Sequence, residues 1–421
     1  MNTLSTRNGI GVVHATGNEN VRQVLSALTN AGNLDSFSTT LGWTKASQIA
    51  NMPSRLRVVA AKRMFDMLSQ GQLTTQPARE TLRNLLRLAP VSGLRRLSDT
   101  RNHFGIDWVA KGLDIAVAKR LEGGWAPSVL FGYPNQVRLS FEKARQLGIL
   151  TVLELPHTHW STTRRILLEE ALRNPDWAST VEIPKGRSSL SDDADEELSF
   201  ADLVLSPSSQ VSRSILEFDS KIDPIFAPYG CPAVAEETSP LRWDGKGPLR
   251  VLFVGRVQAS KGIADIAEVC RRMGSEIELS IIGAVPNVTS IPLHNFLRNV
   301  TYLGVLSRGD VLRHMRQNHV FLLPSLVEGR SLAALEAVSS GLPIVVTPGS
   351  GVEDLAQAGA GITVEANSPD QIHTALSSFL QEPSLVCSFS ARSLDIARKS
   401  SWTAYHDILL CALTALIARD G

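Results

Sequence analysis

The stretch LRVLFVGRVQASKG, residues 249–262, decides the fold. Its first half is nearly all apolar and ends at Gly255, as expected of a strand with both faces covered. Helical segments and further apolar runs then alternate down to residue 380. This alternation predicts βαβ units and a doubly wound parallel sheet. The expected strands are Leu249–Val254, Ile277–Ile282, Val300–Leu303, Val320–Leu323, Ile344–Thr347 and Ile362–Val364.

The N-terminal half shows the same alternation less regularly. Its expected strands are Ile10–Ala15, Val129–Tyr133, Leu150–Leu155 and Leu203–Ser206. The pattern is interrupted by an insertion at 51–101, which looks helical and holds ten Lys or Arg against three Asp or Glu. Two doubly wound domains in tandem would place a cleft between the carboxyl ends of their strands, where such sheets bind ligands.

Domain limits follow from composition. Residues 231–248 are rich in Pro, Gly and charge, so they are interpreted as a linker. It separates an N-terminal domain, 1–230, from a C-terminal domain, 249–400. The last helix, within 401–421, follows the final strand and has an apolar side, so we expect it to cross back to the N-terminal domain.

The bulk composition is that of an ordinary globular protein. The 421 residues are 43% hydrophobic and 20% charged, and the net charge of +1 gives no overall bias toward nucleic acid. The start has no signal-peptide pattern, and no apolar run has a membrane-spanning length. We therefore expect a cytoplasmic protein, with contact at the inner face of the membrane left open. Four cysteines without CxxC spacing predict neither zinc nor disulfides: Cys231, Cys270, Cys387 and Cys411.

Two constellations carry chemistry. In the first, GRVQASKG at 255–262, Arg256 and Lys261 follow a strand, and two cations there can grip a diphosphate. The alternative is a pair of solvated charges. In the second, EGRSLAALE at 328–336, a helix begins whose free N–H groups suit phosphate. Carboxylates such as Glu328 and Glu336 suit sugar and ribose hydroxyls, although an ordinary helix surface is the alternative.

Together with GLPIVVTPGSG at 341–351, these motifs resemble the retaining glycosyltransferases of the large group 1 family (family 4), which have the GT-B fold. The resemblance implies that Arg256 and Lys261 contact the donor diphosphate, Glu328 the transferred sugar and Glu336 the ribose. Arg330 stands where an aromatic residue is usual, which bears on sugar specificity. The further donor-binding residues implied are Gly17, Gly255, Gly329, Arg330, Ser331 and Leu332.

The N-terminal half offers weaker candidates. Gly17 follows the first strand and would let the backbone approach the donor, or it is a plain turn glycine. The segment ELPHTHW, 154–160, carries two histidines where the family has one beside the reacting sugar. His157 and His159 are both candidates, and a histidine without a role is the alternative.

The resemblance implies a hexosyltransferase that moves a hexose from a nucleoside-diphosphate sugar to a hydroxyl acceptor, a saccharide or glycolipid, with retention. Neither a cofactor nor a metal is expected, since SDDADEE at 191–197 is interpreted as an exposed helix start. Alternatives are a non-catalytic nucleotide-sugar-binding protein and a nucleotide-sugar epimerase of the same fold. A dinucleotide-dependent oxidoreductase is disfavoured because no GxGxxG follows a strand.

Within the insertion, basic and apolar residues recur at helical spacing, with arginines at Arg79, Arg83 and Arg87. Such a face can dock on anionic lipid, but it is also what a solvated helix presents. Nucleic acid is not an expected partner, because aromatic residues are not interleaved.

Overall fold

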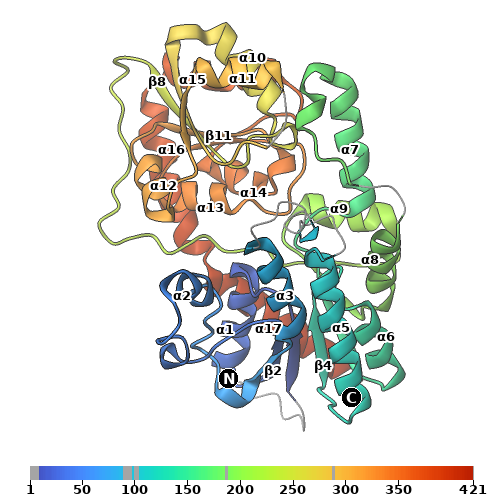
Figure 1. The fold of residues 1–421 in the computed structure, drawn as a ribbon. Helices are drawn as coiled ribbons and strands as arrows, with labels where there is room; N and C mark the ends of the chain where they lie inside the picture. The colour runs from blue at the N-terminus through green and yellow to red at the C-terminus, as the bar shows by residue number, and fades with distance from the viewer. Residues whose placement is uncertain (1–8, 89–96, 99–103, 185–187, 287–289, 421) are drawn as a thin grey trace.

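A computed structural model describes residues 9–88, 97–98, 104–184, 188–286 and 290–420. In these residues the chain forms two sheets whose neighbouring strands are parallel, one in each half (Figure 1). The N-terminal sheet has the order β3-β2-β1-β4-β5-β6-β7 and the C-terminal sheet β10-β9-β8-β11-β12-β13. The predicted α/β class with two doubly wound domains is therefore confirmed.

The strands are short and their ends fall at turn residues. In the N-terminal sheet they are β1 Ile10–Val13, β2 Leu34–Thr39, β3 Leu73–Thr75, β4 Val129–Gly132, β5 Leu150–Glu154, β6 Leu203–Ser206 and β7 Ile225–Phe226. In the C-terminal sheet they are β8 Leu249–Val254, β9 Ile277–Ile282, β10 Thr301–Gly304, β11 Val320–Leu323, β12 Ile344–Val346 and β13 Gly361–Thr363.

Helices cover both sheets (Figure 1). Those of the N-terminal half are α1 Glu19–Asn30, α2 Ser54–Ala61, α3 Pro77–Leu88, α5 Ile106–Glu122, α6 Arg138–Gln146, α7 Trp160–Arg173, α8 Ser189–Phe200 and α9 Ser209–Phe218. Those of the C-terminal half are α10 Ile263–Met273, α11 Ile291–Arg298, α12 Arg308–Met315, α13 Leu332–Ser339, α14 Glu353–Leu355, α15 Pro369–Gln381, α16 Ser384–Lys399 and α17 Trp402–Asp420. In the part of the chain described, no helix has the length and apolar character to cross a membrane.

Central strands are buried completely, which explains their unbroken apolar sequences. Every residue of β4, VLFG, and of β11, VFLL, is buried. Burying an aliphatic side chain contributes about 1.5–3 kcal/mol, so these strands are the core on which the loops at their carboxyl ends are held.

The insertion at 51–101 is not simply helical. Among its described residues it supplies α2 and α3 but also β3, which extends the N-terminal sheet beside β2. Neither β2 nor β3 was expected from the sequence. The strand β2, LDSFST, lacks an apolar pattern because half of its residues are Ser or Thr. Its Ser36 and Ser38 face Arg120 of α5, whose guanidinium donates to their hydroxyl oxygens at 3.1 and 3.4 Å. Side-chain hydrogen bonds thus satisfy a buried strand that lacks an apolar pattern.

The last helix crosses between the two halves. As predicted, α17 packs against α1, and the ring of His406 is 3.0 Å from the amide oxygen of Gln23. The chain crosses a second time at the start of the linker, where Cys231 pairs with Ser401 in an isolated parallel bridge. The two crossings lie side by side.

A buried carboxylate joins these crossings to the N-terminal sheet. Glu154, the last residue of β5, accepts hydrogen bonds from the hydroxyl groups of Tyr229 at 2.5 Å, Tyr405 at 2.9 Å and Tyr133 at 3.3 Å. Burial raises the pKa of Glu154, and the three hydroxyl donors oppose that shift. One side chain of the N-terminal sheet therefore binds a residue next to the linker and a residue of the last helix.

Candidate active site

Both sequence motifs follow strands at the point where the order of the C-terminal sheet reverses. The strands β8 and β11 are neighbours there, and their loops lead into 255–262 and 324–331. This is the place where doubly wound sheets bind ligands. Gly262 has a φ of +69°, and a Cβ at this position would lie 2.2 Å from the carbonyl oxygen of Pro324. Glycine is therefore required for the two loops to meet.

The two loops bring Lys261 and Glu328 into contact. The Nζ atom of Lys261 lies 2.6 Å from Oε2 of Glu328, and Ser325 donates its hydroxyl to Oε1 of the same carboxylate at 2.5 Å. Both charged side chains keep less than a fifth of their surface exposed. A cation and a carboxylate from separate motifs thus occupy one small region at the edge of the sheet.

Glu336 lies in the second turn of α13, apart from Glu328. The helix begins at Leu332, and Ser331 caps it by accepting from the amide of Ala334 at 3.4 Å. The Oε1 atom of Glu336 is 2.7 Å from Nε of Arg308, at the start of α12. The sequence analysis did not single out Arg308, since a lone arginine at a helix start carries no motif.

Arg256 is paired with a residue of the N-terminal half. Its guanidinium makes two contacts with the carboxylate of Glu182, at 2.5 and 3.0 Å. We call Arg256 and Lys261 the cation pair. Each member has a carboxylate partner: Glu182 for Arg256 and Glu328 for Lys261.

The N-terminal domain touches the second motif directly at Gly329. A Cβ on Gly329 would lie 1.7 Å from the carbonyl oxygen of Pro156 and 3.0 Å from Cα of His157. Thr158 donates its hydroxyl to the carbonyl oxygen of Glu328 at 2.9 Å. The segment after β5 therefore lies against the loop that carries Glu328.

The geometry distinguishes the two histidines. His159 is buried at the start of α7, where its ring contacts Ser161 at 2.7 Å and Asp195 at 3.1 Å and stacks on Phe218. Both ring nitrogens of His159 are engaged within the protein, and a role in catalysis stays a prediction. His157 is an exposed residue whose Cα lies beside Gly329.

Arg330 is buried and paired within the protein. Its side chain is 1% exposed and pairs with the carboxylate of Asp354 through two contacts of 2.9 Å. It also donates to the carbonyl oxygens of Tyr229 at 3.1 Å and Gly351 at 2.9 Å. These contacts fasten the loop after β11 to the chain before the linker, and a role of Arg330 in donor binding stays a prediction.

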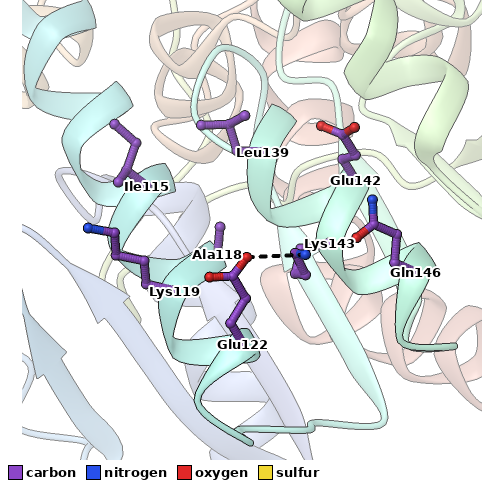
Figure 2. Close-up of a pocket in the computed structure, with 8 residues that line it drawn as sticks. All are labelled: Ile115, Ala118, Lys119, Glu122, Leu139, Glu142, Lys143 and Gln146. Carbon is purple, nitrogen blue, oxygen red and sulfur yellow. Dashed lines mark ion pairs between the residues drawn. The ribbon is translucent and has the colours of Figure 1, made fainter.

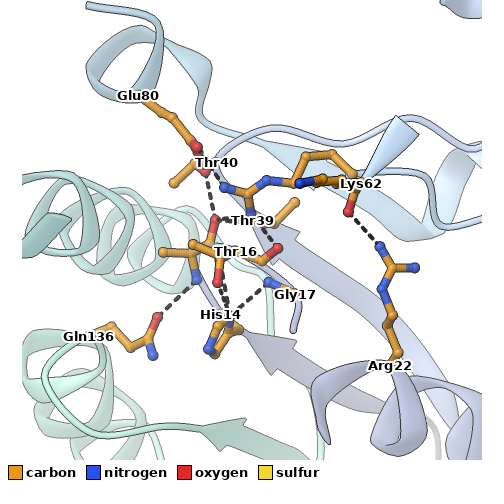
Figure 3. Close-up of polar contacts among 11 residues, drawn as sticks. His14, Thr16, Gly17, Arg22, Thr39, Thr40, Lys62, Glu80 and Gln136 are labelled. Atoms are coloured by element: carbon orange, nitrogen blue, oxygen red, sulfur yellow. Dashed lines mark hydrogen bonds and ion pairs between the residues drawn. The ribbon is translucent and has the colours of Figure 1, made fainter. Parts of the chain in front are cut away.

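Gly17 is explained by packing within the N-terminal domain. It has a φ of +61°, and a Cβ there would lie 2.4 Å from the ring of Phe65. Its amide donates to Nδ1 of His14 at 2.8 Å, and Figure 3 shows this turn beside Thr40 and Glu80. Its role in donor binding stays a prediction.

The same turn is held by charged groups that the sequence analysis missed. Arg63 donates to the carbonyl oxygen of Thr16 and pairs with Glu80 at 2.6 Å, and Glu80 also accepts from Thr40. Burial lowers the pKa of His14 to about 3, so its Nδ1 stays a hydrogen-bond acceptor at neutral pH. The only signal in the sequence was the basic insertion that contains Arg63.

Other surface features lie away from these loops. A groove of about 350 Å³ between α5 and α6 is lined by charged side chains, with Lys143 and Glu122 3.1 Å apart (Figure 2). Among the described residues, no group of three or more His, Cys, Asp or Glu side chains is arranged to hold a metal ion.

The fold defined by these two domains is GT-B. Over 98% of this chain and 100% of the other, it matches sucrose-phosphate synthase from Thermosynechococcus elongatus with a TM-score of 0.66 at 16% identity. It also matches a UDP-forming trehalose-phosphate synthase from Burkholderia xenovorans with a TM-score of 0.64 at 16% identity, over 98% and 99% of the two chains.

Residues 240–394 match the model of the family described as glycosyl transferases group 1, which confirms the predicted resemblance over that range. An amylovoran biosynthesis glycosyltransferase, AmsK of Erwinia amylovora, is 32% identical over 26% of this chain and 30% of its own length. A D-inositol 3-phosphate glycosyltransferase of Paenarthrobacter aurescens is 25% identical over 42% of this chain and 48% of its own. The chain thus spans less than half the length of these relatives.

Proposed function

We propose that the protein is a retaining hexosyltransferase that uses a nucleoside-diphosphate sugar as donor and a hydroxyl group of a saccharide or lipid-linked saccharide as acceptor. The observation that carries this proposal is the contact of Lys261 with Glu328, beside the close approach of Gly329 to Pro156. A cation and a carboxylate for the donor then lie where the other domain can present an acceptor.

In this proposal the donor lies across the start of α13. The cation pair binds the diphosphate, which the free N–H groups of the helix also favour. Glu328 accepts hydrogen bonds from the hexose and Glu336 from the ribose. The helical part of their spacing, from Leu332 to Glu336, rises about 6 Å at 1.5 Å per residue, and the loop 328–331 adds the rest. That span suits a sugar diphosphate folded over the helix end.

Bond cleavage places negative charge on the departing diphosphate, and the cation pair stabilises it. The anomeric C–O bond to phosphate breaks, the acceptor oxygen bonds to the same carbon on the same face, and its proton passes to a phosphate oxygen. The exposed His157, whose Cα lies beside Gly329, can hydrogen-bond a sugar hydroxyl. The cation pair supplies this stabilisation without a metal ion, and turnover in EDTA tests that part of the proposal.

The alternative of a binding protein without turnover loses support from the position of Arg330. A binding protein without turnover was favoured by the changed loop 328–336, since a cation there could disturb the sugar site. The side chain of Arg330 instead points to Asp354, and the loop keeps both glutamates and the helix start. Hydrolysis of donor in the absence of acceptor would distinguish a transferase from a protein that only binds.

The two glutamates should have separable roles, which tests the donor orientation. Glu336→Gln should weaken binding of the free nucleoside diphosphate by about ten- to a hundredfold, because a hydrogen bond to a charged group contributes ~1.5–3 kcal/mol. Glu328→Gln should leave nucleotide binding nearly intact and slow transfer by a similar factor. Calorimetric Kd for UDP, ADP and GDP, beside kcat for transfer, gives both readouts. Reversed effects would show that the donor lies the other way round.

We also propose that α3 contacts an anionic membrane surface that carries the acceptor. Two of its leucines, Leu82 and Leu85, are 42% and 62% exposed. The arginine stripe is only partly available, because Arg79 donates to the carbonyl oxygen of Trp108 and stacks on its ring, whereas Arg87 is exposed. Exposed leucines beside a cation are typical of helices that lie in a lipid interface.

Vesicle binding tests the membrane contact. Replacing Leu82 and Leu85 together by Glu should lower co-sedimentation with vesicles containing 30% phosphatidylserine at least threefold, because apolar area is lost and negative charge is added. Leu172→Glu on α7, where an exposed leucine is also replaced, is the matched control. Equal binding of all three proteins to these vesicles would contradict the proposal.

A further inference from the structure

The segment that follows α7 belongs to the N-terminal half of the sequence but lies on the C-terminal domain. We call residues 174–184 the strap. Just before it, Arg173 at the end of α7 contacts Asp265 of α10 at 2.8 Å, and that carboxylate is almost fully buried. Within it, the ring of Trp177 meets the ring of Phe296 of α11 edge-on at 6.4 Å. Figure 1 shows α7 beside α10 and α11, away from the N-terminal sheet.

Beyond these two anchors the strap ends at the cation pair. The carboxylate of Glu182 makes two contacts with the guanidinium of Arg256, at 2.5 and 3.0 Å. The side chains are 39% and 47% exposed, so this ion pair is accessible to solvent and to a ligand. A planar carboxylate facing a guanidinium through two contacts has the geometry with which arginine binds phosphate oxygens.

We propose that Glu182 is an internal anion that occupies Arg256 until the donor diphosphate displaces it. The inference rests on the proposed function, in which Arg256 binds that diphosphate. Two negative groups on one guanidinium repel each other, so Glu182 must leave, or share Arg256 at a cost, when the donor enters. Glu182 thereby lowers the affinity for nucleotide and couples donor entry to movement of the strap.

The Lys261–Glu328 contact differs from the Arg256–Glu182 contact in what happens to the carboxylate when the donor binds. Glu328 has a place in the donor site once Lys261 turns to the diphosphate, because its carboxylate can accept from the hexose. Glu182 reaches the site from a strap anchored outside it, through Arg173 and Trp177. Its removal should therefore increase nucleotide affinity, whereas removal of a residue that positions Arg256 would decrease it.

Calorimetry on the full chain tests this with UDP, ADP and GDP as probes. For whichever probe binds the wild type most tightly, Glu182→Gln should lower Kd about two- to fivefold, or ~0.4–1 kcal/mol, in 25 mM salt. The gain should shrink in 0.5 M salt, where exposed charges are screened within a few ångströms. Asp176→Asn is the matched control, because it removes one exposed charge from the same strap. Its Kd should stay near the wild-type value.

A double-mutant cycle separates the inference from the function on which it rests. Arg256→Ala should weaken nucleotide binding, and in that background Glu182→Gln should have no further effect. Unchanged or weaker binding by Glu182→Gln alone would overturn the role of Glu182 as an internal anion. Unchanged binding by Arg256→Ala, or binding of none of the three probes, would instead overturn the proposed donor site.

Discussion

Replacing Lys261 by alanine should lower kcat/KM for sugar transfer by about a hundredfold. The Nζ atom lies 2.6 Å from Glu328, at the strand ends where the diphosphate is proposed to leave. A positioned cation that meets charge developing in the transition state contributes ~2.7 kcal/mol or more, which corresponds to that factor. Loss of the cation should lower kcat as well as affinity, because the charge grows as the bond breaks.

The control for this prediction is Lys246→Ala. Lys246 is 88% exposed, contacts Asp244 at 3.5 Å, and precedes the amino end of β8, whereas Lys261 follows the carboxyl end of that strand. The measurement is kcat/KM of both variants by steady-state kinetics. Thermal unfolding verifies that Lys261→Ala remains folded. A Lys261→Ala enzyme with wild-type kcat/KM would show that the diphosphate is held elsewhere.

A single methyl group on Gly329 should be nearly as damaging to transfer. Its Cβ would lie 1.7 Å from the carbonyl oxygen of Pro156, far inside van der Waals contact, so the two loops must separate by more than 1 Å. Misplacement on that scale can cost about a hundredfold in rate. Gly329→Ala should therefore reduce kcat at least tenfold.

Binding of free nucleotide should change little in that variant, since the cation pair and Glu336 belong to the C-terminal domain. Gly71→Ala is the control, because no atom lies within 4 Å of a Cβ built there and its φ is not positive. The measurement is kcat together with calorimetric Kd for both variants. If Gly329→Ala keeps wild-type turnover, contact between the two loops is not needed for catalysis.

The C-terminal sheet could be predicted almost to the residue, because its central strands are largely apolar and buried. The bounds of β8 and β11 agree with the expectation from sequence. The strand β2 could not be found in the same way, since its buried hydroxyls are satisfied by Arg120 rather than by an apolar pattern. The polarity pattern of a short segment gives no information about a hydrogen-bond partner that is distant in sequence.

The site shows the same division. Neighbouring strands carry the two motifs to one edge of the sheet, so the proximity of Lys261 and Glu328 follows from topology. The direction of Arg330 and the choice between His157 and His159 depend on carboxylates distant in sequence, Asp354 for the arginine and Asp195 for His159. Motif spacing gives no information about those partners.

The carboxylate of Glu154 has a consequence for engineering. Exchange of whole C-terminal domains is an obvious route to new donor specificity in a two-domain enzyme. Here Tyr229 and Tyr405, which lie on either side of the C-terminal domain in sequence, both donate to Glu154 of the N-terminal sheet. A chimera that lost either hydroxyl would leave a buried acceptor short of donors. The junctions should therefore lie after Tyr229 and before Tyr405. The host part of the chimera then keeps both of its own tyrosines.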